Sequence, residues 1–191
     1  MSKTTSIMIV GVGGQGTLLA SKLLGRLLLD EGFDVKVSEV HGMSQRGGSV
    51  VTYVKFGEKV YSPIIADAEA DYIVSFEKLE AARYISCLSK DGKIIVNTQE
   101  IDPMPVIIGN AAYPSDILSS LEAAGASVDA LDALSLAEEA GSSKAVNIVL
   151  MGRLARYLSI EKEKWLKAIE TSVKPAFIEL NKKAFELGYN C

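Results

Sequence analysis

The chain has 191 residues, of which 48% are hydrophobic and 23% charged, and its formal net charge at pH 7 is −4. This length is typical of one globular domain that buries a sizeable core. The acidic balance gives no reason to expect nucleic acid or an anionic membrane as a partner, and no apolar run reaches the roughly 18 residues of a membrane span. A strand pattern begins almost at the N-terminus, so we expect no signal peptide and a cytoplasmic location.

The first predicted elements are a strand, a glycine turn and a helix. Residues 7–10 form a short apolar run that is typical of a buried parallel strand, and leucines at helical spacing follow from Thr17. The turn between them has the pattern G-x-G-x-x-G and contains Gly11, Gly13, Gly14, Gln15 and Gly16. Glycine allows a tight turn and a close approach to a ligand, and a helix start favours an anion. Alternatively, these glycines only permit a close contact between helix and sheet.

A second strand is predicted over residues 34–38, and Glu39 stands at its carboxyl end. In a nicotinamide-dependent enzyme, an acidic residue at this position would bind the ribose hydroxyls. Glu39 could instead brace the following loop, for example through an ion pair with Arg46. The sequence leaves both roles open.

The loop after Glu39 is polar and rich in glycine. Its candidate binding residues are His41, Gln45, Arg46, Gly47 and Gly48. Arg46 would hold a phosphate or carboxylate through its guanidinium group, or brace the loop or an interface. His41 is the sole histidine and cannot form a metal site alone, so a binding or structural role is favoured over proton transfer. If the first two strands are adjacent, both loops open at one sheet edge and form a single anion-binding crevice; the alternative is a solvated turn.

The rest of the chain predicts strands followed by helices. A β-hairpin is predicted over residues 50–63, with a turn at 57–59. Further strands are predicted over 71–76, 93–97 and 106–108, with a turn at 91–92 and a short strand near 128. Helices are predicted over 79–88, 114–124, 134–140 and 145–158, then from Ser159 and from Pro175. The expected fold is a Rossmann-like, doubly wound α/β fold with a mostly parallel sheet, a β-hairpin insertion and a helical C-terminal region. Residues 1–133 are expected to form the sheet core of a single domain, and 134–191 its helical extension.

Two of these motifs resemble a known family. Residues 11–16, G-V-G-G-Q-G, and residues 39–50, E-V-H-G-M-S-Q-R-G-G-S-V, are similar to the gamma-type domain of the 2-oxoacid:ferredoxin oxidoreductases. Residues 181–189 also resemble the closing helix of that family, so the resemblance covers nearly the whole chain. Within the family, the sequence is most similar to the small (beta) subunit of the indolepyruvate type. The two motifs are specific to the family rather than to one 2-oxoacid.

The resemblance implies oxidative decarboxylation of an arylpyruvate to its acyl-coenzyme A, with ferredoxin as the electron acceptor. It implies that thiamine diphosphate, Mg²⁺ and the iron–sulfur clusters lie in a large partner subunit. The two chains would form a hetero-oligomer, and this chain would be inactive alone and help to bind coenzyme A.

The residue inventory fits a subunit without these cofactors. Cys87 and Cys191 are the only cysteines, whereas a four-iron cluster requires four thiolates. No G-D-G run followed by Asn-Asn, the pattern that would hold thiamine diphosphate, is present. Two alternatives remain. One is a stand-alone dinucleotide-binding oxidoreductase that uses the glycine turn and Glu39. The other is a purely structural subunit of a pyruvate- or 2-oxoglutarate-specific complex.

Overall fold

The computed structural model describes residues 4–39 and 48–191, and six strands of these residues form one sheet. The strands are β1 (Thr5–Val12), β2 (Asp34–Glu39), β3 (Ser49–Gly57), β4 (Ala70–Ser75), β5 (Leu88–Asn97) and β6 (Ser127–Leu131). Their order is β2-β3-β1-β4-β5-β6. Neighbouring pairs among β1, β4, β5 and β6 are parallel, whereas β3 is antiparallel to both of its neighbours. The predicted mostly parallel sheet is confirmed.

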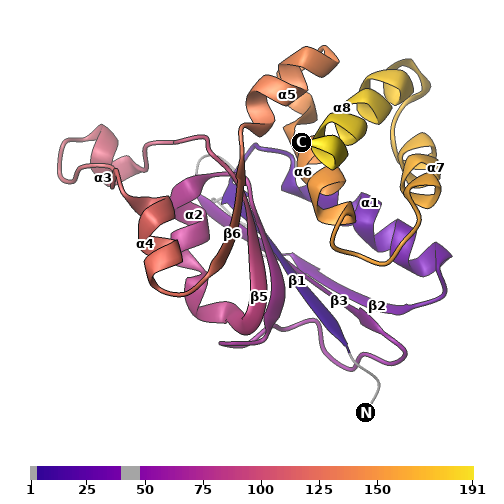
Figure 1. Cartoon of the computed structure of the whole chain (residues 1–191), viewed down its shortest axis with the longest axis horizontal. Helices are drawn as coiled ribbons and strands as arrows, with labels where there is room; N and C mark the ends of the chain where they lie inside the picture. The colour runs from indigo at the N-terminus through magenta and orange to yellow at the C-terminus, as the bar shows by residue number, and fades with distance from the viewer. Residues whose placement is uncertain (1–3, 40–47) are drawn as a thin grey trace.

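Helices cover both faces of this sheet. They are α1 (Thr17–Asp30), α2 (Lys78–Arg83), α3 (Met104–Ile107), α4 (Ile117–Ala123), α5 (Ala133–Ala140), α6 (Val146–Ala155), α7 (Lys162–Ser172) and α8 (Ile178–Asn190). Short 3-10 helices lie at η2 (Ile85–Cys87), η3 (Ser143–Ala145) and η4 (Pro175–Phe177). Figure 1 shows α1 and α5–α8 on one side of the sheet and α2 and α4 on the other. The predicted helical C-terminal region is confirmed. No helix of the described residues is both long and apolar enough to span a membrane.

β1 is buried on both faces, which explains the apolar run of residues 7–10 at its centre. Ile7 and Ile9 belong to the core shared with α1 and the C-terminal helices. Met8 and Val10 belong to a second core, shared with α2 and α4. The alternation of side chains along one strand therefore joins the two cores through the sheet.

The β-hairpin of the sheet is formed by β2 and β3, and the hairpin predicted over residues 50–63 is wrong. β3 pairs with β1 on one side and β2 on the other, so neither of its edges is left for residues 58–63. The Val60 N–H instead donates to Asp34 Oδ2 at 3.0 Å, and Lys55 Nζ donates to the Ile64 carbonyl at 3.1 Å. β3 also separates β1 from β2, so the expected adjacency of the first two strands is wrong as well.

Three further element predictions are wrong. The strand expected over residues 106–108 is helix α3 with its end, because Pro105 suits the first turn of a helix. The turn expected at residues 91–92 lies inside β5, where a Cβ on Gly92 would come within 2.7 Å of the Ala70 carbonyl. The helix expected from Ser159 begins at Lys162.

The C-terminal helices pack through glycine contacts. An added Cβ on Gly152 of α6 would lie 2.2 Å from the Phe185 carbonyl oxygen, and one on Gly188 of α8 would lie 2.0 Å from the Val149 carbonyl oxygen. Only glycine at both positions permits this approach of the two backbones. The crossing holds the buried Phe185 against Trp165 of α7, with ring centroids 5.8 Å apart.

Candidate functional site

The glycine turn borders a crevice of about 670 Å³ at the carboxyl edge of the sheet, named here the glycine-loop crevice. Its lining includes Gly14, Gln15, Gly16, Gln99, Glu138 and Lys144. These residues come from the turn after β1, the segment after β5, and α5 with the following 3-10 helix. β1 and β4 are parallel neighbours whose connections leave in opposite directions, and ligands of doubly wound folds bind at such a switch point.

Gln15 holds the glycine turn against the sheet. Its Oε1 accepts a hydrogen bond from the Val12 N–H at 2.7 Å, and its Nε2 donates to the Phe76 carbonyl at 3.1 Å. The Asn97 Nδ2 donates to the same carbonyl at 3.1 Å. The carboxyl ends of β1, β4 and β5 are thereby joined around one carbonyl group.

The glycines of the turn have separate reasons for lacking a side chain. A Cβ on Gly11 would lie 2.8 Å from Gln15 Oε1, so Gly11 serves close packing. Gly14 and Gly16 have φ values of 103° and 88°, a region that other residues rarely adopt. Gly16 also precedes α1, and its carbonyl accepts from Asn147 Nδ2 of α6 at 3.3 Å. Part of the motif therefore serves the fold, while Gly14 and Gly16 also line the crevice.

The structure brings two predicted site residues together and keeps one apart from the crevice. The Gly13 N–H donates to the Gly48 carbonyl at 2.9 Å, so the end of the polar loop meets the glycine turn. Glu39 accepts from the Ser21 hydroxyl of α1 at 2.7 Å and is not among the residues that line the crevice. The other predicted residues of this loop, His41, Gln45, Arg46 and Gly47, lie outside the described residues.

Gln99, Glu138 and Lys144 line the crevice but were missed from the sequence. Lys144 and Glu138 are exposed and bring one positive and one negative charge to the lining. Gln99 could have been found, because it follows the predicted strand 93–97 and so belongs at the same carboxyl edge. Lys144 and Glu138 carry no such signal, since they flank a turn between two helices more than a hundred residues from the glycine motif.

A buried carboxylate lies on the other side of the same edge. Glu77 is 1% exposed and accepts from the Glu80 N–H at 2.9 Å, the Ile101 N–H at 3.3 Å and the Tyr113 hydroxyl. Burial raises the pKa of Glu77 above its usual range, although these hydrogen bonds oppose the shift. Glu77 is the N-cap of α2, so its carboxylate fixes the start of that helix.

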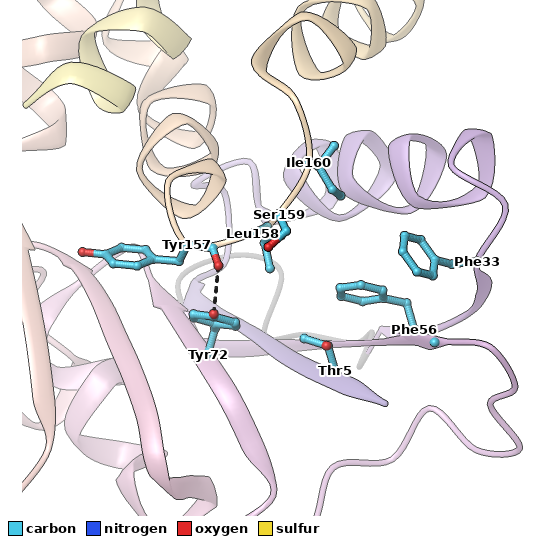
Figure 2. Close-up of a pocket in the computed structure, with 9 residues that line it drawn as sticks. Thr5, Phe33, Phe56, Tyr72, Tyr157, Leu158, Ser159 and Ile160 are labelled. Atoms are coloured by element: carbon cyan, nitrogen blue, oxygen red, sulfur yellow. Dashed lines mark hydrogen bonds between the residues drawn. The ribbon is translucent and has the colours of Figure 1, made fainter. Parts of the chain in front are cut away.

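A smaller cavity of about 280 Å³ lies at the opposite, amino edge of the sheet (Figure 2). Phe33, Phe56 and Tyr72 form much of its wall, and the Tyr72 hydroxyl donates to the Tyr157 carbonyl at 3.1 Å. Among the described residues, those that line this cavity have no charged side chain. Its contacts tie the sheet to the connection between α6 and α7.

Comparison of the sequence with known proteins identifies relatives over nearly its whole length. The family model described as pyruvate ferredoxin/flavodoxin oxidoreductase matches residues 6–191. Indolepyruvate oxidoreductase subunits IorB from Thermococcus kodakarensis and Pyrococcus horikoshii are each 45% identical to this chain, over 97% of it and 95% of the relative. The subunit of the same name from Archaeoglobus fulgidus is 39% identical over 97% of this chain and 94% of the relative.

Solved structures share the fold. The gamma subunit of keto/oxoacid ferredoxin oxidoreductase from Geobacter sulfurreducens superposes with a TM-score of 0.69 at 24% identity, covering 97% of this chain and 96% of that chain. Subunit PORC of pyruvate oxidoreductase from Thermotoga maritima gives a TM-score of 0.73 at 22% identity, covering 98% and 96%. The family match and the full-length relatives confirm the resemblance carried by the two glycine motifs, and the chain belongs to the pyruvate ferredoxin/flavodoxin oxidoreductase family.

Proposed function

We propose that this chain is the small, cluster-free subunit of an indolepyruvate:ferredoxin oxidoreductase. The observation that carries the proposal is the 45% identity, over nearly the full length of both chains, to two subunits named for indolepyruvate. Relatives named for pyruvate or for pyruvate and ketoisovalerate are only 25–27% identical. The reaction is oxidative decarboxylation of an arylpyruvate to its acyl-coenzyme A, with ferredoxin as the acceptor, in the cytoplasm.

In this proposal a large companion subunit holds thiamine diphosphate, Mg²⁺ and the iron–sulfur clusters. Two sequence features support the assignment: this chain has only two cysteines, and it has no thiamine-binding pattern. The residues after β1 would contribute to the surroundings of the active site. The first and second parts of the chain, residues 1–133 and 134–191, act as one domain of the complex.

The glycine-loop crevice is the proposed site for a phosphate-bearing part of coenzyme A. Its volume of about 670 Å³ is within the usual range of small-molecule sites. The start of α1 favours an anion, and Lys144 adds a positive charge at the rim. Arg46, predicted from the sequence, would be a second cation. The chemistry of acyl transfer belongs to the thiamine cofactor of the companion, whereas residues of this chain bind and orient.

The alternative of a stand-alone dinucleotide-binding oxidoreductase gains no support from this geometry. A ribose-binding acid has to face the crevice beyond the glycine turn, but Glu39 is bonded to Ser21 and does not line that crevice. β3 also lies between β1 and β2, where a nicotinamide-binding fold has the two strands side by side.

The proposal is tested by reconstitution. The chain is co-expressed with the large thiamine- and cluster-containing chain of the same genome, and reduction of ferredoxin is measured with indolepyruvate and coenzyme A. We expect activity only when both chains are present. Turnover with pyruvate but not indolepyruvate would contradict the substrate, and tight binding of NAD(P)H by the isolated chain would contradict the function.

A further inference from the structure

The segment between Ile101 and Tyr113, named here the arm, protrudes from the surface and carries one charged residue, Asp102, at its root. From Pro103 to Tyr113 the sequence has no charged residue. Met104, Ile107 and Ile108 are 64%, 64% and 59% exposed. None of the three side chains belongs to either hydrophobic core. Figure 1 shows α3, which contains the first two of them, at the outer margin of the molecule and away from the sheet.

The arm is nevertheless a formed structure. Inside it, the Asn110 and Ala111 N–H groups both donate to the Pro105 carbonyl, at 2.8 and 3.1 Å. At its root, the Ile101 N–H and the Tyr113 hydroxyl both donate to Oε1 of the buried Glu77. One carboxylate therefore ties both ends of the arm to the start of α2. Ordered apolar side chains held away from any core are typical of a surface that another protein covers.

We propose that the tip of the arm, Met104, Ile107 and Ile108, is an anchor that inserts into an apolar, uncharged recess of the large companion subunit. This inference rests on the proposed function. The arm follows β5 after a short connection. Gln99 lies in this connection and lines the glycine-loop crevice. A companion that holds thiamine diphosphate opposite this crevice would pass beside the root of the arm.

The exposed area favours the companion over a second copy of this chain. Full burial of three such side chains removes on the order of 200–350 Å² from water. Two arms packed on each other would thus bury about 700 Å² at most, less than the roughly 1,200 Å² at which specific interfaces begin. The same area is ample for a central anchor within a larger interface, where a few buried side chains dominate the binding.

The test measures binding of this chain to the companion subunit by sedimentation or sizing, with Met104→Glu and Ile107→Glu variants. Ile64→Glu is the matched control. Ile64 is 56% exposed, but it follows β3, which ends at the amino edge of the parallel strands, whereas the arm follows β5 at their carboxyl edge. We expect each arm variant to raise the dissociation constant at least tenfold and the control to change it less than twofold. The thermal unfolding midpoint of the isolated chain should be unchanged in all three.

Each other outcome overturns the proposal in a distinct way. If the arm variants bind the companion as wild type does, the arm is not the anchor, while the proposed function stands. If Ile64→Glu weakens binding equally, the effect is not specific to the arm. If the wild-type chain self-associates and the arm variants do not, the occupant is a second copy. If the wild-type chain does not bind the companion at all, the proposed function falls together with the anchor.

Discussion

Gln15 shows how a residue inside a ligand-binding motif can serve the fold. Its side chain spans from the Val12 N–H to the Phe76 carbonyl, and Gly11 lacks a Cβ because Gln15 Oε1 occupies that space. The glycine turn is therefore held in shape before any ligand arrives. Such preorganisation lowers the cost of binding, since the backbone N–H groups need not be ordered by the ligand.

We predict that Gln15→Ala destabilises the chain by about 1–3 kcal/mol, because it leaves the buried Val12 N–H without its acceptor. The free energy of unfolding in urea measures the effect. Gln99→Ala is the control: its side chain makes weaker contacts, with Asn97 Nδ2 at 3.3 Å and Gln15 Nε2 at 3.5 Å, so the loss should be smaller. Equal stability of wild type and Gln15→Ala would show that the side chain does not hold the turn.

We predict that Lys144→Ala raises the Michaelis constant of the assembled enzyme for coenzyme A by a few-fold, about 1 kcal/mol or less, because an exposed charge contributes little. Arg46 lies outside the described part of the chain. If its guanidinium group binds a phosphate, Arg46→Ala should weaken coenzyme A binding by roughly 1.5–3 kcal/mol. Lys167→Ala, an exposed lysine of α7, should have no effect. Unchanged constants in both site variants would place coenzyme A elsewhere.

At the scale of elements, the local signals were sufficient for the strand, glycine turn and helix at residues 5–30, because each depends on neighbouring residues. They were insufficient for β3. An apolar, β-branched run indicates a strand but not its partners, and the insertion of β3 between β1 and β2 is a tertiary choice. The candidate site was likewise predictable where it depends on neighbouring residues and not where it depends on tertiary packing. The turn was found, whereas Glu138 and Lys144 reach the crevice only through the packing of α5 and α6.

We predict that Gly188→Ala weakens the packing of α8 on α6 and costs at least about 2–3 kcal/mol, because the added Cβ meets the Val149 backbone. Gly25→Ala in α1 is the matched control. A Cβ there would make an ordinary contact of 3.6 Å with Val37, and alanine is the better helix former by about 1 kcal/mol. The midpoint temperature of thermal unfolding should therefore be lowered by Gly188→Ala and unchanged or raised by Gly25→Ala. The reverse order would refute the glycine contact.

Glu77 should give the folding stability of the chain a distinctive pH dependence, because it holds α2 and the arm in place. Because burial raises its pKa in the folded state above the reference value of 4.5, its stabilising contribution is fully present below that pH and is lost as pH rises through the folded pKa. The stability difference between wild type and Glu77→Gln should thus shrink from pH 4 towards neutrality. Glu69 provides the opposite sign: hydrogen bonds from the Ala66 N–H and Lys55 lower its pKa, so the difference for Glu69→Gln should grow with rising pH. Urea titrations at several pH values would distinguish the two slopes.

At the scale of the whole molecule, the helical C-terminal region and the sheet share one core. Ile7 of β1, Leu23 of α1, Trp165 of α7 and Phe185 of α8 are all buried within the same cluster. A second link is polar. Asp129 of β6 accepts from Arg153 Nε and Nη2 of α6, at 2.6 and 2.9 Å, and from the Tyr157 hydroxyl at 2.5 Å. Burial opposes ionisation of Asp129, but these hydrogen bonds hold its pKa below the usual range. Residues 134–191 therefore complete the core begun by residues 1–133.

We predict that the chain unfolds in one cooperative step. Trp165, the single tryptophan, is fully buried in the helical region, so its fluorescence reports on that region, while far-ultraviolet circular dichroism reports on all helices and strands. Both signals should change at the same urea concentration, because exposing the helices would also expose Ile7 and Leu23.

Asp129→Asn weakens the link to Arg153 and should lower the free energy of unfolding by about 3 kcal/mol, as expected for breaking a mostly buried pair. It should shift the fluorescence and circular dichroism transitions together. If fluorescence changes first, the helical region is a separate folding unit, and a fragment of residues 1–133 should then fold alone.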